Sequence, residues 1–159
     1  PQVSQVPITH NLIERLLTEF PGIVVGIKDS SGDKDNLKIM VERFPALGVL
    51  AGADPLLLPL LQMGGAGCIT ATSNLRSADL AIIWDIWKDP ARAAELAAAQ
   101  DRINAWRNLT NSYVQLPTVK AMLARSRGNL GWLRLRPPLV ELNTVQCNAV
   151  WAEMARLGG

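Results

Sequence analysis

Short apolar runs alternate with longer amphipathic segments along the first 88 residues of this 159-residue chain. Each run is apolar at almost every position, which is typical of a strand buried on both faces of a parallel sheet. The expected strands are residues 23–28, 48–52 and 66–71, and the expected helices are residues 9–20, 34–43, 55–63 and 77–88. Strands and helices that alternate at such short intervals indicate right-handed βαβ crossovers, so the pattern predicts an α/β fold.

Helices alone follow beyond residue 88. Their apolar positions recur with helical spacing, and the expected helices are residues 91–109, 116–125 and 140–157. The change of pattern divides the chain into two expected domains. Residues 1–88 would contain three β/α units, and residues 89–159 would form a C-terminal helical extension.

Composition excludes several classes of function. The chain is 48% hydrophobic and 19% charged with a net charge of +2, and no apolar run approaches the ~20 residues of a membrane-spanning helix. The balanced charge provides no basic stripe, so we expect neither a nucleic-acid nor a membrane partner. Cys68 and Cys147 lie far apart and His10 is the single histidine, so we expect reduced thiols and no metal site. Reduced thiols without a secretory signal are typical of a cytoplasmic protein.

Lys28 stands at the end of the first apolar run, where a charged residue needs a reason. A lysine desolvated among aliphatic side chains loses part of the solvation that favours its ammonium form, and the neutral amine can then attack a carbonyl. This chemistry would make Lys28 the nucleophile that forms a Schiff base. Alternatively, Lys28 extends its amine into solvent from the strand end, or pairs with Asp29 or Asp33. Spacing alone leaves both roles open.

Polar residues follow each of the three expected strands. They are Lys28, Asp29 and Ser30 after the first, Gly52, Ala53 and Asp54 after the second, and Thr70, Thr72, Ser73 and Asn74 after the third. Side chains from the carboxyl ends of parallel barrel strands converge on one face, so these residues should lie together. Three β/α units do not close a barrel, whose usual length is ~250 residues. We therefore expect this chain to be part of a longer barrel.

Three motifs at these strand ends carry a family resemblance. They are Gly26-Ile27-Lys28-Asp29-Ser30-Ser31-Gly32-Asp33, Ala51-Gly52-Ala53-Asp54, and Gly64-Gly65-Ala66-Gly67-Cys68-Ile69-Thr70-Ala71-Thr72-Ser73-Asn74. In order and spacing they resemble the second half of the dihydrodipicolinate synthase and N-acetylneuraminate lyase family, as does the segment Leu116-Pro117-Thr118-Val119-Lys120. The resemblance implies the last three strands of a (β/α)₈ TIM barrel followed by a C-terminal helical extension. It also implies a class I lyase or aldolase in which Lys28 forms a Schiff base with pyruvate or another 2-oxo acid, without a metal or organic cofactor.

Four more residues in these motifs are candidates for binding the substrate. Ser30 would hydrogen-bond a substrate hydroxyl or carboxylate, or cap the helix that follows it. Asp54 would face the substrate or cap the next helix, and the two roles are compatible. Gly52 would let the backbone approach a ligand closely, or serve as a plain turn between strand and helix. For Ile69 the family implies a main-chain carbonyl near the pyruvyl group, with the side chain in the core.

Other positions depart from the family's pattern. Pro1 is similar to the proline of the family's tyrosine-x-x-proline motif, and the tyrosine of that motif, which relays protons in the family, would precede the chain. The segment of the family's second barrel strand that holds the substrate carboxylate is also absent from this sequence. Val3 stands where dihydrodipicolinate synthases have an arginine, and Pro55 and Ala71 stand where N-acetylneuraminate lyases have a glutamate and a serine. We therefore expect neither of these two activities, and we expect this chain alone to be inactive.

The expected function is thus cleavage or formation of a carbon–carbon bond next to a 2-oxo acid such as pyruvate. The alternatives are a 2-oxo sugar-acid dehydratase of the same family and a non-catalytic relative that binds a 2-oxo acid. The apolar faces of an incomplete barrel would lie open to water, which predicts a partner segment, most simply the missing N-terminal half of the barrel. The family resemblance further implies a homo-oligomer, either a tetramer or a dimer.

Overall fold

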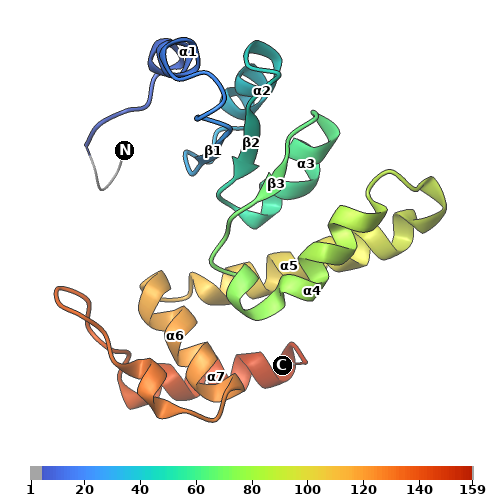
Figure 1. The fold of residues 1–159 in the computed structure, drawn as a ribbon. Coiled ribbons are helices and arrows are strands. Elements are labelled where there is room, and N and C mark those ends of the chain that lie inside the picture. The colour runs from blue at the N-terminus through green and yellow to red at the C-terminus, as the bar shows by residue number, and fades with distance from the viewer. Residues whose placement is uncertain (1–4, 159) are drawn as a thin grey trace.

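A parallel sheet forms the centre of the first part of the chain (Figure 1). In the computed structural model, which describes residues 5–158, its strands are β1 (Gly26–Asp29), β2 (Gly48–Ala51) and β3 (Gly67–Cys68), in the order β1-β2-β3. Lys28 pairs with Leu50 in the register, and Leu50 pairs with Gly67. The predicted α/β fold class with parallel strands is confirmed, although the first strand begins later than expected and the third ends earlier.

The third strand ends early because the chain leaves the sheet after residue 69. The Ile69 amide still donates to the Ala51 carbonyl at 2.9 Å. The hydroxyls of Thr70 and Thr72 then donate to the Asp54 carboxylate, which draws this segment towards the end of β2.

Four helices and one 3₁₀ turn accompany the sheet. They are α1 (His10–Glu19), α2 (Lys34–Arg43), the 3₁₀ turn η1 (Asp54–Leu56), α3 (Leu57–Gln62) and α4 (Ser73–Ile86). The helix expected at 55–63 is therefore divided into η1 and α3. Helix α4 starts before the expected residue 77 because a short helical turn precedes a kink at Arg76, where φ is −130° and ψ is 38°. We call these elements, from α1 to α4, the barrel part.

The remaining elements, which we call the helical part, contain no described strand. They are η2 (Pro90–Arg92), α5 (Ala93–Thr110), α6 (Gln115–Ser126), η3 (Leu130–Leu133) and α7 (Thr144–Arg156). Helix α7 begins after the expected residue 140 because Asn143 and Gln146 form a reciprocal capping box at its start. No helix within residues 5–158 is both long and apolar enough to cross a membrane.

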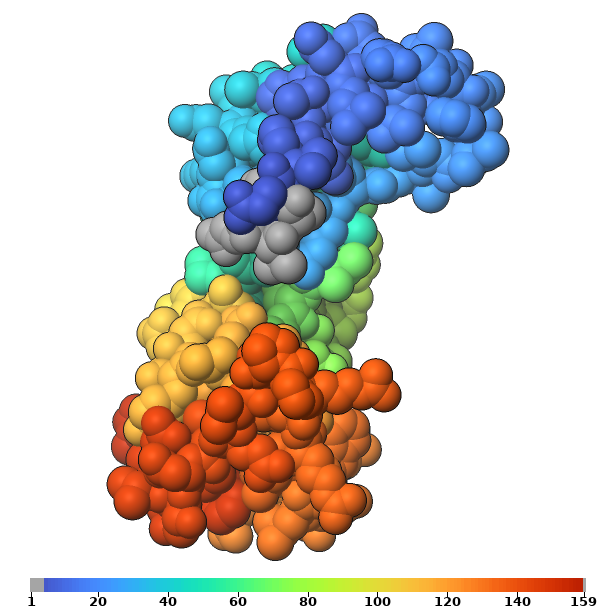
Figure 2. All heavy atoms as spheres, turned by 90° about the vertical axis from the view of Figure 1, so that its left-hand side faces the viewer, coloured from blue at the N-terminus to red at the C-terminus, as the bar shows by residue number. Residues whose placement is uncertain are grey.

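Three apolar clusters form the core of the described chain. The first joins α1 and α2 to β2, through residues such as Ile13, Leu37 and Val49. The second packs α3 and α4 against the first half of α5, and the third packs the second half of α5 against α6 and α7. Helix α5 therefore belongs to both interfaces and fixes the helical part below the sheet (Figures 1 and 2).

One face of the sheet is covered and the other is open. Val49 and Ala51 of β2 are buried against α2 and α3, whereas Lys28, on the opposite face, is exposed. Ile23 and Val25, which belong to the first apolar run, are 75% and 69% exposed. The expectation of strands buried on both faces is therefore wrong for the described residues, because among them no element covers the second face and no strand pairs with the outer edge of β1 or β3.

Candidate functional site

Lys28 is positioned by the parallel pairing of β1 with β2, one residue before β1 ends. The two carboxylates that were its alternative partners are both engaged elsewhere. Asp29 accepts from the Ser31 amide, the Ser31 hydroxyl and the Asn36 side chain at 2.8–3.1 Å. Asp33 caps α2 by accepting from the amides of residues 35 and 36. Among residues 5–158 Lys28 forms no ion pair, so its amine is free for a ligand.

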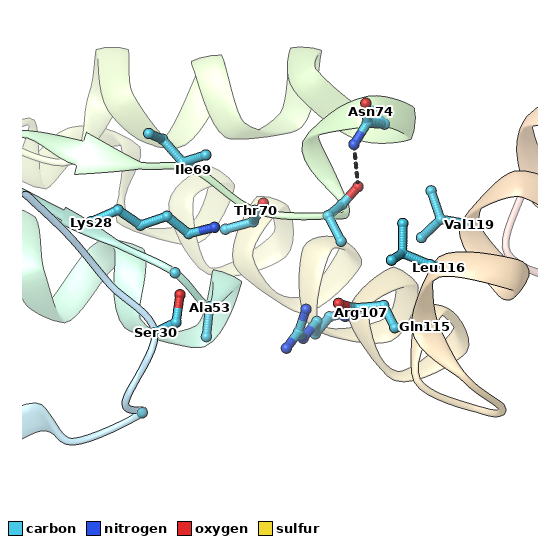
Figure 3. Close-up of a pocket in the computed structure, with 13 residues that line it drawn as sticks. Lys28, Ser30, Ala53, Ile69, Thr70, Asn74, Arg107, Gln115, Leu116 and Val119 are labelled. Atoms are coloured by element: carbon cyan, nitrogen blue, oxygen red, sulfur yellow. Dashed lines mark hydrogen bonds between the residues drawn. The ribbon is translucent and has the colours of Figure 1, made fainter. Parts of the chain in front are cut away.

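A pocket of about 530 Å³ opens at the carboxyl ends of the strands, and Lys28 extends into it (Figure 3). Its lining includes Lys28 of β1 with Ser30 and Gly32 after it, Gly52 and Ala53 after β2, Ile69, Thr70 and Ala71 after β3, and Asn74 at the start of α4. The helical part closes the far side with Arg107, Gln115, Leu116 and Val119. The predicted convergence of the three strand ends is therefore present, and four of the five candidate residues, Lys28, Ser30, Gly52 and Ile69, line one pocket.

Ser30 and Gly52 lie against each other at the mouth of this pocket. The Gly52 amide donates to the Asp29 carbonyl at 2.7 Å. A Cβ atom at position 52 would lie 2.6 Å from the Asp29 carbonyl oxygen and 2.9 Å from Ser30 Cα, so only glycine fits here. Ser30 does not cap α2, a role that Asp33 fills, and its hydroxyl has no hydrogen-bond partner among the described residues. Gly52 thus brings the Ser30 side chain close to the second strand.

Asp54 is fully buried and does not line the pocket. Its carboxylate accepts from the Thr70 hydroxyl at 2.6 Å and from the Thr72 hydroxyl at 2.9 Å. Arg107 of α5 lies 3.9 Å away, measured from its Nε to Asp54 Oδ2. The interpretation of Asp54 as a helix cap is wrong, because its side chain bonds no amide of the following helix and Ala53 occupies the capping position. The carboxylate instead ties the end of β2 to the segment after β3.

Ile69 departs from its expected surroundings. Its side chain is 51% exposed and lines the pocket beside Lys28, whereas the family resemblance implies a place in the core (Figure 3). The reason is that Ile69 follows an edge strand, and no described strand lies beyond it to bury the side chain.

The contribution of the helical part to this site was not predicted from the sequence. Arg107, Gln115, Leu116 and Val119 line the pocket although they lie far from the strand motifs in the sequence. The motif that contains Leu116 and Val119 carried a signal through its family resemblance. Nothing near Arg107 marked it, because it occupies an ordinary polar position in the last turns of an amphipathic helix.

Few titratable or metal-ligating side chains lie in or near the site among the described residues. Burial, followed by the nearby Asp54 carboxylate, raises the pKa of the Cys68 thiol to about 11. Cys68 is therefore protonated at neutral pH and is a poor nucleophile. Within the described chain no three histidine, cysteine or carboxylate side chains are grouped as metal ligands. Among the described residues that line the pocket, Lys28 carries the one primary amine.

Comparison with known protein families gives a match over nearly the whole chain. The dihydrodipicolinate synthetase family model matches residues 1–156. An uncharacterized DapA-like lyase of Chloroflexus aurantiacus is 34% identical over 157 residues, which are 99% of this chain and 51% of that protein. A 4-hydroxy-tetrahydrodipicolinate synthase of Listeria monocytogenes is 33% identical over 153 residues, which are 92% of this chain and 48% of that enzyme.

Solved structures agree on the fold. Dihydrodipicolinate synthase from Agrobacterium tumefaciens superposes with a TM-score of 0.78 at 25% identity, over 99% of this chain and 51% of that one. YagE from Escherichia coli, solved in complex with pyruvate, gives a TM-score of 0.82 at 20% identity, over 95% of this chain and 51% of that one. The match to half of each structure confirms the expected fold, a partial TIM barrel with three of its parallel strands.

Pro1, expected as the proline of the tyrosine-x-x-proline motif, and Val3, expected at the arginine position of the synthases, lie outside the described residues. The chain spans about half the length of the curated relatives it matches. The strand motifs, the fold and the sequence similarity over nearly the whole chain all indicate the same family. The chain belongs to the dihydrodipicolinate synthetase family.

Proposed function

We propose that this chain supplies the Schiff-base half of a lyase or aldolase that acts on pyruvate or a related 2-oxo acid. The observation that carries the proposal is the placement of Lys28, which extends without an ion-pair partner among the described residues into the pocket at the carboxyl ends of the strands. Membership of a family whose named relatives are lyases and synthases supports the same chemistry.

The proposed reaction begins when the neutral Lys28 amine adds to the C2 carbonyl carbon of the 2-oxo acid. Uptake of a proton from solvent and loss of water then give an iminium, which withdraws electrons from the neighbouring carbon. In the cleavage direction the C4 hydroxyl loses its proton, the C3–C4 bond breaks, and an aldehyde leaves while an enamine remains on Lys28. Protonation at C3 and hydrolysis by water release pyruvate and restore the amine. Condensation runs through the same steps in reverse.

The neighbours of Lys28 suit the binding of the acid. The Ser30 hydroxyl, which has no described partner, is available to donate to the substrate carboxylate or a hydroxyl. Gly52 and Ile69 bring backbone to the same pocket, and the half-exposed Ile69 side chain offers an apolar contact for the methyl end of pyruvate. We assign Asp54 a positioning role instead of a direct contact, because it is buried behind Thr70.

We also propose that the active unit contains more than this chain. Val25 before β1, Ile69 after β3 and Trp84 of α4 are about half exposed or more. A second apolar hollow, beside the free edge of β3, is lined by Leu50, Leu57, Leu80 and Trp84, among others. A segment equivalent to the other half of the relatives' length would cover these surfaces. The homo-oligomer and the cytoplasmic location inferred from the sequence remain predictions, as does the domain boundary at residue 88.

Borohydride trapping tests the nucleophile. The assembled protein, meaning this chain with whichever segment supplies the remaining strands, is incubated with pyruvate and sodium borohydride and mapped by peptide mass spectrometry. We expect one reduced pyruvyl group on Lys28, none in Lys28→Met, and unchanged labelling in the control Lys34→Met, whose lysine starts α2 outside the pocket. An assembled protein whose Lys28 stays unmodified with pyruvate and with longer 2-oxo acids would contradict the proposal.

Product analysis then separates the reactions. An aldolase releases pyruvate and an aldehyde from a 4-hydroxy-2-oxo acid, whereas a dehydratase removes water from a 2-oxo sugar acid without cleaving its carbon chain. Labelling of Lys28 without either product would support the non-catalytic alternative.

A further inference from the structure

Among the described residues, the pocket around Lys28 is lined by two basic side chains and no acidic one. They are Lys28 from the barrel part and Arg107 from α5. No aspartate or glutamate among the described residues lines the pocket. The carboxylates of Asp54 and Asp29 accept hydrogen bonds from threonine, serine and asparagine side chains. The pocket therefore favours anionic ligands. Arg107 contributes a positive charge that takes no part in forming the Schiff base on Lys28.

Arg107 lines the pocket, and its guanidinium N–H groups form no hydrogen bond with the described residues. Its side chain is 21% exposed, and its one ion pair places Nε 3.9 Å from Asp54 Oδ2, too far for a hydrogen bond. The Asp54 carboxylate already accepts shorter hydrogen bonds from the hydroxyls of Thr70 and Thr72. The guanidinium thus makes no hydrogen bond to any residue between 5 and 158, while Figure 3 shows it pointing into the space between Ser30 and Gln115.

Another buried aspartate in the same chain shows what a purely structural pair looks like. Asp79 of α4 receives direct hydrogen bonds from Arg76 at 2.6 Å and from Arg102 at 3.1 Å. Neither of these arginines lines the pocket with Lys28. Asp54 instead accepts hydrogen bonds from two threonine hydroxyls, and the planar guanidinium group of Arg107 receives no such partner among the described residues. A guanidinium group without hydrogen bonds matches a carboxylate, which it can bind through two parallel N–H···O bonds.

Gln115 is the second polar side chain at the end opposite Lys28, where Leu116 and Val119 add an apolar wall. Gln115, at the start of α6, lines the pocket beside Arg107 and carries further amide donors, although its Nε2 donates to Asn111 Oδ1 at 2.8 Å. The volume of about 530 Å³ falls in the range of roughly 300–1,000 Å³ that accommodates drug-sized ligands, so a three-carbon acid would leave much of it empty.

We infer that Arg107 binds a second carboxylate at the far end of the substrate, so that the preferred ligands are 2-oxo acids with two acid groups. This inference rests on the proposed function, in which the 2-oxo end of the same molecule reacts with Lys28. The first carboxylate stays beside the reacting carbon, and the second is held across the pocket by the guanidinium fork. The helical part thereby selects the substrate while the barrel part supplies the nucleophile.

A matched pair of acids tests the subsite. 2-Oxoglutarate and 2-oxopentanoate have the same carbon chain, and they differ in the terminal carboxylate. Borohydride trapping on the assembled protein gives the concentration at which half of Lys28 is modified. We expect 2-oxoglutarate to need about one-tenth of the concentration of 2-oxopentanoate or less, as for one charge-assisted pair. Arg107→Gln should abolish this preference between the two acids, and Arg107→Lys should retain part of it.

Controls separate the subsite from folding and from the Schiff base. Arg92→Gln removes an exposed arginine that pairs with Glu95 outside the pocket, and it should leave the preference intact. Calorimetric binding of the two acids to Lys28→Met measures the subsite without the covalent step. A missing preference in both experiments, or a preference that survives in Arg107→Gln, would overturn the inference. Preferred binding of 2-oxoglutarate to Lys28→Met, with no trapping in the wild type, would uphold the subsite and refute the proposed nucleophile.

Discussion

The helical part and the barrel part bury their apolar side chains to different extents. The helical part closes a core of its own, in which Trp106, Met122 and Val150 are at most 3% exposed. The barrel part buries one face of its sheet and leaves Ile23 and Val25 largely in solvent. Helices satisfy their backbone within each segment, whereas a sheet requires a neighbouring strand at each edge. The helical part therefore closes a core with its own helices, whereas the sheet of the barrel part depends on further strands.

The largest effect should come from the closed core. Met122 of α6 is fully buried between α5 and α7, so Met122→Ala would leave a cavity. We expect a loss of about 2–5 kcal/mol in the free energy of unfolding, measured by urea denaturation. Met122→Leu, which nearly conserves volume, should cost less than about 1.5 kcal/mol. Equal costs for the two variants would show that this core is not tightly packed.

An intermediate effect should come from the junction of the two parts. Asp54→Asn keeps the shape of the side chain but weakens its bonds with Thr70 and Thr72 and removes the ion pair with Arg107. We expect a loss of about 1–3 kcal/mol in the same measurement, because buried acceptors lose charged hydrogen bonds. Asp35→Asn is the matched control, since this aspartate is exposed on α2. A loss no larger than that of the control would mean that the Asp54 network does not hold the strand ends together.

The smallest effect should come from the exposed residues just before β1. Val25→Thr exchanges a methyl group for a hydroxyl and keeps the branched shape at a position that is 69% exposed. In this chain alone we expect a change within about 0.5 kcal/mol, as for other exposed positions. A loss above about 1 kcal/mol would contradict the exposure of this side chain. A larger loss in the assembled protein than in this chain would place the covering segment beside the start of β1.

The same contrast explains which structural predictions succeeded. Helix α2 was predicted at its observed residues, 34–43, because Asp33 and the apolar spacing define it locally. The third strand, expected at 66–71, was reduced to Gly67–Cys68. Its end depends on hydroxyl bonds from Thr70 and Thr72 to an aspartate in another β/α unit, which no local pattern of apolar residues reveals.

The sequence by itself determined the order of the elements, the family motifs and the candidate lysine, because apolar periodicity and strand-end motifs are written in neighbouring residues. Only the tertiary structure decided that Asp54 turns away from the pocket and that Arg107 enters it. Both outcomes depend on where α5 packs against the barrel part, through contacts between residues far apart in the chain. Such contacts arise from the shapes of whole elements, and the residue types at positions 54 and 107 do not encode them.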